Sequence, residues 1–565
     1  MPVLTYPKIK PKFKKEEWVL GKVLEHQAKT IGDKPFLQWG SEKPHSFSDV
    51  NRTVNRLAHG LAALGVTKGD TVVLFARNSL DYLYSWFALN KLGAIECPIN
   101  TAYKGSFLEH QANLSKARLM ILDRELAPAV VESEANMPHL EQVILWSPRG
   151  VDKGQEPAFT RVKTRDFHDI LTRDTSNPKV QVTSRDLASI MFTSGTTGPS
   201  KGVMMPHAHN YFFSEECRHL VSLTSRDTYM TGFPFFHANA QLLTIYPSLI
   251  AGARCVCYER FSPSAFVDRL YESRCTVTNF LGVAMTFVYE QPPTPRDKGH
   301  KLTRIFAAPT AFKIMADFQK RFGIKEFLEC YGMTEIAIPI LTPTGHKRPA
   351  GACGVAVSDW FDIRVVNPDT DEEVGIGEVG EFIVRHKEPW TLNAGYFGMP
   401  EKTLEAYRNL WFHTGDAVKR DAKGWYYFLD RIKDALRRRG ENISSYEVEA
   451  PILAHPAVDD CAVVGVPADM EAGEDEVKAC VVLKPGAKLT AEELTAWCDK
   501  RMPYFVVPRY IEFYDVLPKT PTEKVQKAKL RAVAFTDKTW DRVKAGYRLA
   551  EEIKRDRAKS EARKR

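Results

Sequence analysis

A dense run of glycine and hydroxyl residues is the strongest chemical signal in the chain. It follows an apolar segment at 187–192 directly, and a lysine stands near its end. Small residues let backbone N–H groups close around phosphate oxygens, while hydroxyl and ammonium groups add donors and positive charge. The pattern is not a Walker loop, because Lys201 is followed by Gly202. The candidate phosphate-binding residues are Thr193, Ser194, Gly195, Thr196, Thr197, Gly198 and Lys201.

Two later strings carry residue types that suit the rest of a nucleotide. The string 331–335 (YGMTE) joins an aromatic ring, which suits a purine, to a carboxylate, which suits a hard cation such as Mg²⁺. The string 414–416 (TGD) supplies a second carboxylate. Each string alone is typical of an ordinary turn. Their combination with the glycine-rich run favours a nucleotide site.

In combination these strings resemble the adenylate-forming superfamily of acyl-CoA synthetases, peptide-synthetase adenylation domains and luciferases. The resemblance covers the chain from about residue 40 to residue 535. It implies that the 193–201 loop holds the phosphates of ATP and that Tyr331 stacks on adenine. It also implies that Thr334 contacts the α-phosphate and that Thr193 and Glu335 bind Mg²⁺.

The same resemblance assigns roles to residues further along the chain. Asp416 accepts hydrogen bonds from the ribose hydroxyls, and Arg431 holds ribose or phosphate. Lys433 matches the hinge about which a small C-terminal domain rotates between two half-reactions. Gly440 belongs to the segment that reaches the active site when the thioester forms. Lys524 matches the adenylation lysine, whose charge offsets the charge that develops on the α-phosphorus.

Two departures from the family pattern occur in this C-terminal part. Glu523 precedes Lys524 where the family usually has glycine, and we expect the lysine to keep its role. Residues 437–439 are three arginines where the family often has Gly-Gly. These arginines either meet the phosphates of coenzyme A or form exposed surface charge, and the sequence does not separate the two readings.

Two segments resemble the walls of the family's acyl pocket. The string 235–241 (FFHANAQ) matches an aromatic and histidine motif in which His237 could gate the pocket, although a core histidine is the competing reading. Ala307 and Ala308 stand where Gly-Gly-Ala is common, and their methyl groups would narrow the pocket. A compact acyl group is therefore favoured over a long chain.

The resemblance implies an ATP-dependent acyl-CoA ligase that uses ATP, Mg²⁺ and coenzyme A. A carboxylic acid is activated as acyl-AMP with release of pyrophosphate, and the acyl group then passes to the thiol of coenzyme A. The C-terminal half looks most like carnitine/crotonobetaine-type CoA ligases, with steroid or aromatic acids as a second substrate class. The sequence is also compatible with an acyl-AMP ligase that loads a carrier protein, a luciferase-like oxygenase or a non-catalytic nucleotide-binding scaffold.

The elements that would position these residues alternate between strands and helices. Residues 50, 54, 57 and 61 form an apolar stripe on a helix, and 71–76, 94–99, 119–122 and 143–146 have the composition of buried strands. This order predicts an α/β fold with parallel-rich sheets, whose strands end at a ligand site. Short strands from about residue 361 predict a small antiparallel or barrel-like unit. We place an N-terminal adenylation domain at 1–432 and a mobile α+β domain at 433–565.

Composition excludes several other classes of protein. The 565 residues are 44% hydrophobic and 26% charged, and their net charge of +8 is too small for a nucleic-acid-binding signature. No run of about 18 apolar residues indicates an integral membrane segment. The ten cysteines are scattered without a CxxC pair, so a reducing cytoplasm is the expected location. The oligomeric state stays open, with a homodimer as one option.

Overall fold

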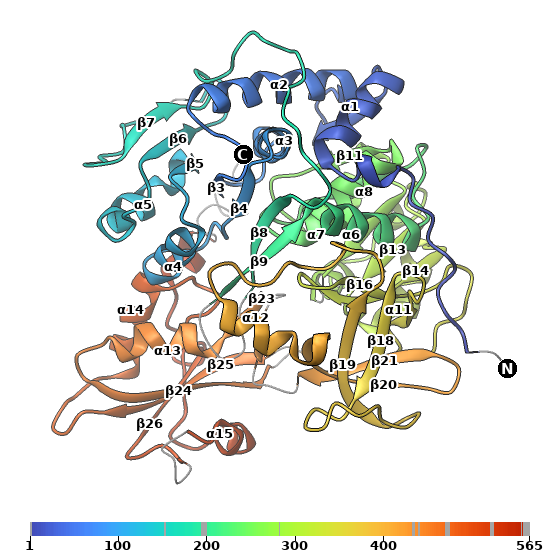
Figure 1. Cartoon of the computed structure of the whole chain (residues 1–565). Helices are drawn as coiled ribbons and strands as arrows, with labels where there is room; N and C mark the ends of the chain where they lie inside the picture. Colours follow the sequence, from blue (N-terminus) through green and yellow to red (C-terminus); the bar gives the residue numbers. More distant parts are fainter. Residues whose placement is uncertain are drawn as a thin grey trace. The chain divides into compact units, whose positions relative to one another are not determined.

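The computed structural model describes residues 3–151, 154–193, 200–281, 283–431, 435–438, 441–468, 475–519, 525–554 and 556. The chain forms two compact units. The first comprises Met1–Thr101, Ala112–Phe192 and Gly202–Ile432, and the second comprises Ala102–Gln111, Thr193–Lys201 and Lys433–Arg565. The predicted α/β fold class is confirmed by the sheets and helices of these units (Figure 1).

One seven-stranded sheet has the order β7-β6-β5-β3-β4-β8-β9. The registers from β7 to β8 are parallel, as the alternation of strands and helices predicts. Its strands are β3 (Thr71–Phe75), β4 (Ile95–Pro98), β5 (Leu119–Asp123), β6 (Gln142–Trp146), β7 (Lys163–Asp166), β8 (Leu187–Thr193) and β9 (Lys201–Pro206).

Capping residues mark the ends of two helices in this part of the chain. Helix α2 (Phe47–Ala63) buries the predicted stripe, and its start is capped by Ser46, whose hydroxyl accepts from the backbone of Asp49. Helix α3 (Leu80–Leu92) ends at Gly93, where φ is 66°. The remaining helices up to residue 220 are α1 (Leu20–Thr30), α4 (Ser106–Ser115), α5 (Ala127–Ser133) and α6 (His207–Leu220).

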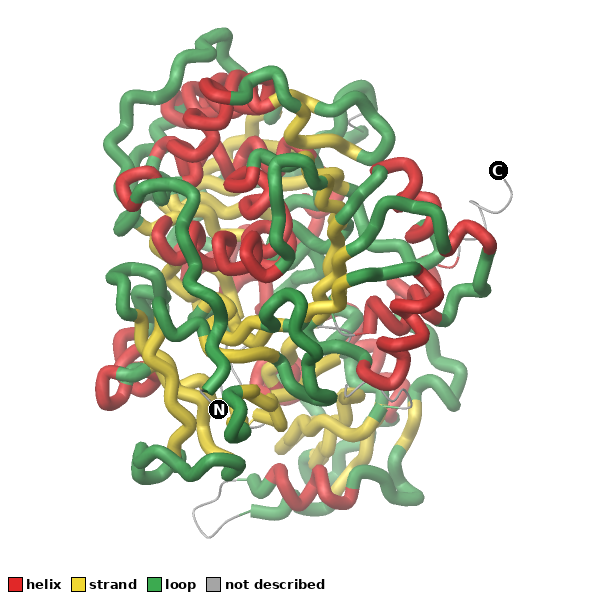
Figure 2. The backbone as a smooth tube through the Cα atoms, turned by 90° about the vertical axis from the view of Figure 1, so that its right-hand side faces the viewer, coloured by secondary structure: helices red, strands yellow, loops and turns green. Residues whose placement is uncertain are grey.

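A second seven-stranded sheet has the order β14-β13-β12-β10-β11-β1-β2, and only β1 with β2 pairs antiparallel. Its strands are β1 (Pro35–Trp39), β2 (His45–Ser46), β10 (Thr228–Thr231), β11 (Arg254–Cys257), β12 (Val277–Phe280), β13 (Arg304–Ala307) and β14 (Glu326–Leu328). The helices between them are α7 (Ala238–Ala240), the π-helical η4 (Gln241–Ile245), α8 (Tyr246–Ala251), α9 (Phe266–Ser273), α10 (Val283–Tyr289) and α11 (Phe312–Phe322). Figure 2 shows how helices and strands are distributed along the backbone.

A third seven-stranded sheet is antiparallel throughout, with the order β15-β16-β17-β21-β20-β19-β18. It is the predicted antiparallel unit, and it starts earlier in the chain than the glycine-rich turns indicated. Its strands are β15 (Cys330–Met333), β16 (Ala337–Leu341), β17 (Gly354–Ala356), β18 (Phe361–Val366), β19 (Val379–His386), β20 (Phe412–Arg420) and β21 (Trp425–Arg431), and α12 (Pro400–Ala406) lies between β19 and β20.

The second unit combines a four-stranded sheet of order β24-β25-β26-β27 with a two-stranded sheet, β22 and β23. Its strands are β22 (Ala435–Arg438), β23 (Glu441–Ser444), β24 (Val458–Pro467), β25 (Asp475–Leu483), β26 (Tyr510–Tyr514) and β27 (Trp540–Asp541). Its helices are α13 (Ser445–Leu453), α14 (Ala491–Arg501) and α15 (Lys527–Val533). This is the smaller α+β architecture that the sequence predicts for the C-terminal part.

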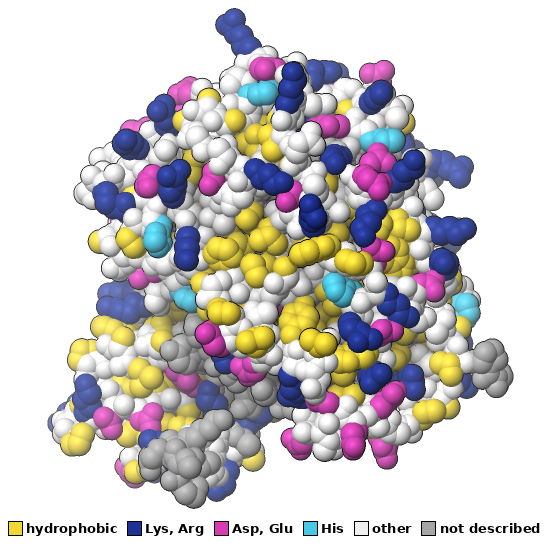
Figure 3. All heavy atoms as spheres, viewed as in Figure 1, with side chains coloured by type: hydrophobic (Ala, Val, Ile, Leu, Met, Phe, Trp, Pro, Cys, Tyr) yellow, Lys and Arg dark blue, Asp and Glu magenta, His cyan; other side chains and the backbone are white. Residues whose placement is uncertain are grey.

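The surface carries charges of both signs. On the face drawn in Figure 3, Lys and Arg side chains alternate with Asp and Glu side chains. Within the part of the chain that the structure describes, no helix is long and apolar enough to cross a membrane.

Candidate active site

Tyr331 and Asp416 meet although 85 residues separate them in the chain. The Tyr331 hydroxyl donates to Asp416 Oδ2 at 2.7 Å, and both residues are buried. The Tyr331 ring lies against Phe428, with centroids 5.9 Å apart and planes 27° apart. The first unit therefore places an aromatic face and a carboxylate side by side, which is the pair of groups that a purine and its ribose require.

The antiparallel sheet holds Asp416 in place. Asp416 lies on β20 directly opposite Arg431 on β21, so the two residues assigned to the ribose are cross-strand partners. The Asp416 backbone N–H donates to the Thr414 hydroxyl at 3.1 Å. Gly415, at φ 71°, donates its N–H to Glu381 Oε1 at 2.9 Å. The TGD string thus lies within β20 where its register with β19 shifts, and glycine suits the positive φ at 415.

Glu335 lies at the end of the hairpin formed by β15 and β16, with Thr334 half-buried beside it. Only 3% of Glu335 is exposed, and the Tyr396 hydroxyl donates to its Oε1 at 3.1 Å. The Asn393 amide donates to the Glu335 carbonyl oxygen at 2.8 Å. A Cβ at Gly332 would lie 1.9 Å from the Ala337 carbonyl oxygen, so glycine is required for this hairpin to close.

The residues that follow the glycine-rich run are tied to the surroundings of Glu335. The Phe397 N–H donates to the Gly202 carbonyl oxygen at 2.8 Å, and Val203 of β9 forms an antiparallel bridge with Tyr396. Tyr396 is the residue that contacts Glu335. The first unit therefore joins the start of β9 and the Glu335 hairpin in one hydrogen-bonded network.

No motif in the sequence indicates Asn393 and Tyr396. They lie 58 and 61 residues from Glu335, so no local spacing links them to it. The one local feature that could have indicated them is Gly395, which stands between them in the sequence and has a φ of 104° in the structure. A glycine flanked by polar and aromatic residues indicates a place where the backbone approaches another segment closely.

Several predicted site residues have only a partial structural account. Thr193 is the last residue of β8 and Lys201 is the first residue of β9, so one lies at each end of the predicted loop. Ser194, Gly195, Thr196, Thr197 and Gly198 lie outside the described residues, as do Lys433, Gly440 and Lys524. For Arg431 the structure describes the backbone alone. The roles of all these residues stay predictions.

His237 stands at the start of helix α7 and is half-buried. Its ring lies 4.4 Å from the Phe236 ring, and its backbone N–H donates to the Pro234 carbonyl oxygen at 3.2 Å. The backbone around the motif is therefore ordered by local turns, and His237 is not sealed in the core.

The three-arginine segment has one buried member. Only 3% of Arg438 is exposed, its Nε lies 2.7 Å from Glu476 Oε2, and its Nη1 donates to the Phe505 carbonyl oxygen at 2.8 Å. The surface-charge reading is therefore wrong for Arg438, and the coenzyme A reading of the segment stays a prediction. A buried guanidinium needs such a carboxylate partner, since an unpaired charge in the interior is costly.

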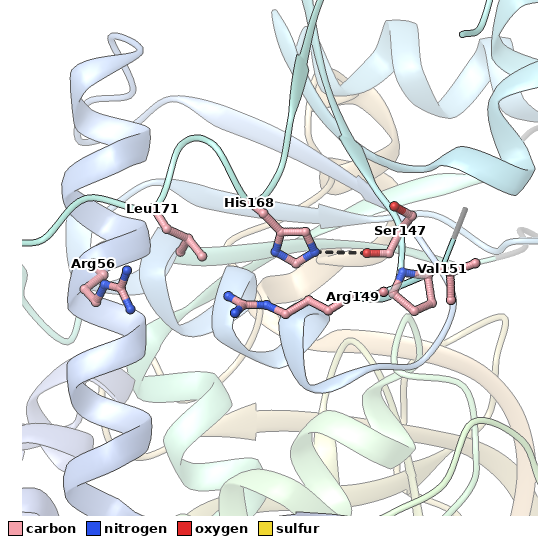
Figure 4. Close-up of a pocket in the computed structure, with 8 residues that line it drawn as sticks. Arg56, Ser147, Arg149, Val151, His168 and Leu171 are labelled. Atoms are coloured by element: carbon pink, nitrogen blue, oxygen red, sulfur yellow. Dashed lines mark hydrogen bonds between the residues drawn. The ribbon is translucent and has the colours of Figure 1, made fainter. Parts of the chain in front are cut away.

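A cavity of about 360 Å³ lies away from these residues, beyond the carboxyl ends of β6 and β7. Arg56, Arg149 and His168 line it, and His168 Nε2 lies 3.1 Å from the Ser147 carbonyl oxygen (Figure 4). None of the predicted site residues lines this cavity. It therefore adds nothing to the nucleotide site.

Comparison with protein families gives a match over most of the chain. The family described as AMP-binding enzyme matches residues 24–397, and its C-terminal domain matches residues 447–524. The chain belongs to the AMP-binding enzyme family. A crotonobetaine/carnitine–CoA ligase of Salmonella heidelberg (strain SL476) is 31% identical over 519 residues, which cover 89% of this chain and 97% of the relative.

Solved structures of AMP-binding enzymes share this fold. The o-succinylbenzoate CoA synthetase MenE from Bacillus subtilis aligns with a TM-score of 0.77 at 23% identity, covering 92% of this chain and 99% of its own. The anthranilate CoA ligase AuaEII in complex with anthranoyl-AMP aligns at 0.66 and 26% identity, covering 91% and 97%. The predicted resemblance and the predicted class, an AMP-forming acid–CoA ligase that uses ATP and coenzyme A, are confirmed.

Proposed function

We propose that this enzyme activates a compact carboxylic acid at the site built around Tyr331, Asp416 and Glu335. The observation that carries the proposal is the buried hydrogen bond between Tyr331 and Asp416, which unites two distant motifs of the chain in one place. The two carboxylate oxygens of Asp416 and the ring of Tyr331 provide the contacts that the adenosine part of ATP needs. Arg431, opposite Asp416 in the sheet, adds a positive group for ribose or phosphate.

In the first half-reaction a carboxylate oxygen of the acid attacks the α-phosphorus of ATP. The bond from that phosphorus to the bridging oxygen breaks, so pyrophosphate leaves and acyl-AMP forms. The 193–201 loop holds the phosphates through its N–H groups, hydroxyls and Lys201. Lys524 stabilises the negative charge that develops around the phosphorus.

In the second half-reaction the thiolate of coenzyme A attacks the acyl carbon, and AMP leaves. The 433–565 domain rotates about Lys433 between the two steps, because one arrangement cannot hold both Lys524 and the thiol at the reacting atoms. Gly440 then reaches the acyl-adenylate. This division into domains 1–432 and 433–565 is part of the proposal.

Mg²⁺ is the cation that suits Glu335 and Thr193. Within the described residues, no group of three or more His, Cys, Asp and Glu side chains could hold a metal ion. Mg²⁺ takes one or two protein oxygens together with water and substrate phosphates. The buried Glu335 carboxylate supplies such an oxygen, and the bound ion would neutralise phosphate charge.

Replacing Glu335 by glutamine is expected to raise the Mg²⁺ concentration for half-maximal adenylation by about tenfold. Glutamine keeps one oxygen that accepts from Tyr396, and it replaces the other oxygen by an NH₂ group and removes the negative charge. The measurement is pyrophosphate release against Mg²⁺ at saturating ATP. The matched control is Glu378→Gln, which changes an exposed glutamate bonded to Gly375. An unchanged Mg²⁺ curve for Glu335→Gln would remove this residue from the metal site.

The acid itself is proposed to be short and compact. Ala307 is buried at the end of β13 and Ala308 is half-buried after it, so each adds a methyl group where glycine is common in the family. The curated relatives include crotonobetaine/carnitine–CoA ligases, which supports a small acid, and AuaEII supports an aromatic one as the next choice.

A series of acids tests this assignment with purified enzyme, scored by AMP release with and without coenzyme A. We expect kcat/KM to fall by about tenfold whenever the acyl chain of the acid is lengthened by a few methylenes. A narrowed acyl pocket cannot hold the added methylenes without overpacking. Ala308→Gly should widen the range of acids accepted. A preference of the wild type for a long-chain acid such as palmitate would reject the compact pocket. A cytoplasmic location and a homodimer remain predictions.

A further inference from the structure

A fully buried glutamate lies beneath the predicted acyl-pocket motif. Glu96 stands on β4, in the interior of the first sheet between β3 and β8, and none of its surface is exposed. Its Oε1 accepts a hydrogen bond from Gln241 Nε2 at 2.8 Å and lies 3.5 Å from the Tyr82 hydroxyl. Within the described part of the chain, its Oε2 is buried and has no hydrogen-bond partner. Burying a carboxyl group in the interior of a sheet costs free energy of desolvation, which indicates that Glu96 has a specific role.

The amide of Gln241 connects Glu96 to the pocket motif. One amide hydrogen goes to Glu96, and the other goes to the Phe235 carbonyl oxygen, also at 2.8 Å. On the other side, the Phe235 N–H donates to Asn78 Oδ1 at 2.8 Å. The backbone of Phe235 is therefore held at both its donor and its acceptor, two residues before His237.

The residue that contacts Glu96, Gln241, stands at the start of an irregular helical turn. Gln241 begins η4, a π-helical turn, and its N–H donates to the His237 carbonyl oxygen at 3.3 Å. Single π-turns inside helices are rare and often occur at functional sites, because they displace side chains from regular helical positions. The Glu96 contact lies at the first residue of this turn, directly after the 235–240 segment.

Burial shapes the charge of Glu96. Desolvation raises its pKa from 4.5 to about 8 against weaker lowering by the hydrogen bonds from Gln241 and Tyr82. Tyr82 on α3 is the titratable group whose contact with it is described, and Cys97 follows it on β4; burial raises the pKa of both. At neutral pH the carboxyl is mostly protonated and acts as a polar, uncharged partner for the amide of Gln241.

We propose that Glu96 is a positioning residue that, through Gln241, fixes the 235–237 segment against the acid substrate. This inference rests on the proposed function, since it assigns that segment to the acyl pocket. Glu96 itself does not touch the reacting atoms. Its loss should therefore weaken binding of the acid and leave binding of ATP unaffected.

Two substitutions test the proposal. Glu96→Ala is expected to raise KM for the acid by about tenfold while KM for ATP changes less than about twofold, because one hydrogen bond to a buried amide is lost. Glu96→Gln keeps an acceptor oxygen without charge and should restore KM to within about threefold of wild type. The matched control is Glu134→Ala, which removes another buried glutamate, one bonded to the backbone at 160–162. Equal changes in both KM values, or none, would overturn the proposal.

The pH dependence provides a second readout. The folded pKa lies above 4.5, so the folded state holds more protons than the unfolded one between pH 4.5 and about 8. Stability contributed by this group therefore falls as pH rises through that window. The free energy of unfolding should fall more steeply with pH in this window in the wild type than in Glu96→Gln, which has no group that ionises there. The same slope in both proteins would contradict the assignment.

Hydrogen exchange separates failure of this proposal from failure of the proposed function. Amides at 235–245 should exchange faster in Glu96→Ala than in wild type and at the wild-type rate in Glu96→Gln, whether or not an acid is found. Unchanged exchange in Glu96→Ala would sink the positioning role even in an active enzyme. A wild type that forms no acyl-AMP would sink the proposed function and leave this measurement valid.

Discussion

Lys524→Ala is expected to lower the rate of acyl-AMP formation by about 10²–10³-fold while leaving the Kd for ATP nearly unchanged. The lysine is assigned to charge that exists only as the α-phosphorus is attacked, and removal of one such donor has an effect of this size. The measurement is pyrophosphate release in single turnover, with ATP binding followed separately by calorimetry.

The same variant should still convert synthetic acyl-AMP and coenzyme A to the thioester, because the second half-reaction uses the other domain arrangement. Lys529→Ala is the matched control, since it removes an exposed positive charge from the neighbouring helix α15. Adenylation by Lys524→Ala at the wild-type rate would show that another group carries this role. Loss of both half-reactions together would argue against rotation about Lys433.

Asp416→Ala is expected to raise KM for ATP by about 10-fold to 100-fold. Asp416 is buried, accepts from Tyr331 at 2.7 Å and is assigned to the ribose, so its removal leaves donors unsatisfied on both the protein and the nucleotide. Tyr331→Phe keeps the aromatic face and loses only the hydroxyl, and it should raise KM for ATP by about fivefold.

The double variant distinguishes a shared site from two separate effects. If Tyr331 and Asp416 act on one nucleotide, their combined effect on KM should be smaller than the product of the single effects. Tyr427→Phe is the matched control, because it removes a hydrogen bond of the same kind, from Tyr427 to Asp421 at 3.1 Å, in the same sheet. Multiplicative effects of Asp416 and Tyr331 would contradict a common ATP site.

Much of the fold follows from periodicity that is local in the sequence. The apolar stripe of α2 and the buried strands β3 to β6 appear where residue spacing predicts them, because each is decided by neighbours within a few residues. The π-turn at 241–245 was not predictable in this way. Its first residue, Gln241, contacts Glu96, which lies 145 residues earlier.

Some residues of the candidate site were predictable from local motifs, and others were not. Motif strings indicate Tyr331, Glu335 and Asp416, whose residue types match the parts of a nucleotide. Their partners Asn393 and Tyr396 come from a distant loop that pairs with β9, so nothing near Glu335 predicts them. For Arg438 the reading as exposed surface charge is wrong, because its ion-pair partner Glu476 lies on β25, far along the chain.

The central claim is that a carboxylate oxygen of the acid attacks the α-phosphorus of ATP. A substrate acid labelled with ¹⁸O in both carboxyl oxygens tests it directly, with AMP, pyrophosphate and acyl-CoA analysed by mass spectrometry after one turnover. The account predicts one ¹⁸O atom in AMP, one in the thioester carbonyl and none in pyrophosphate. Unlabelled AMP, or label in pyrophosphate, would contradict it.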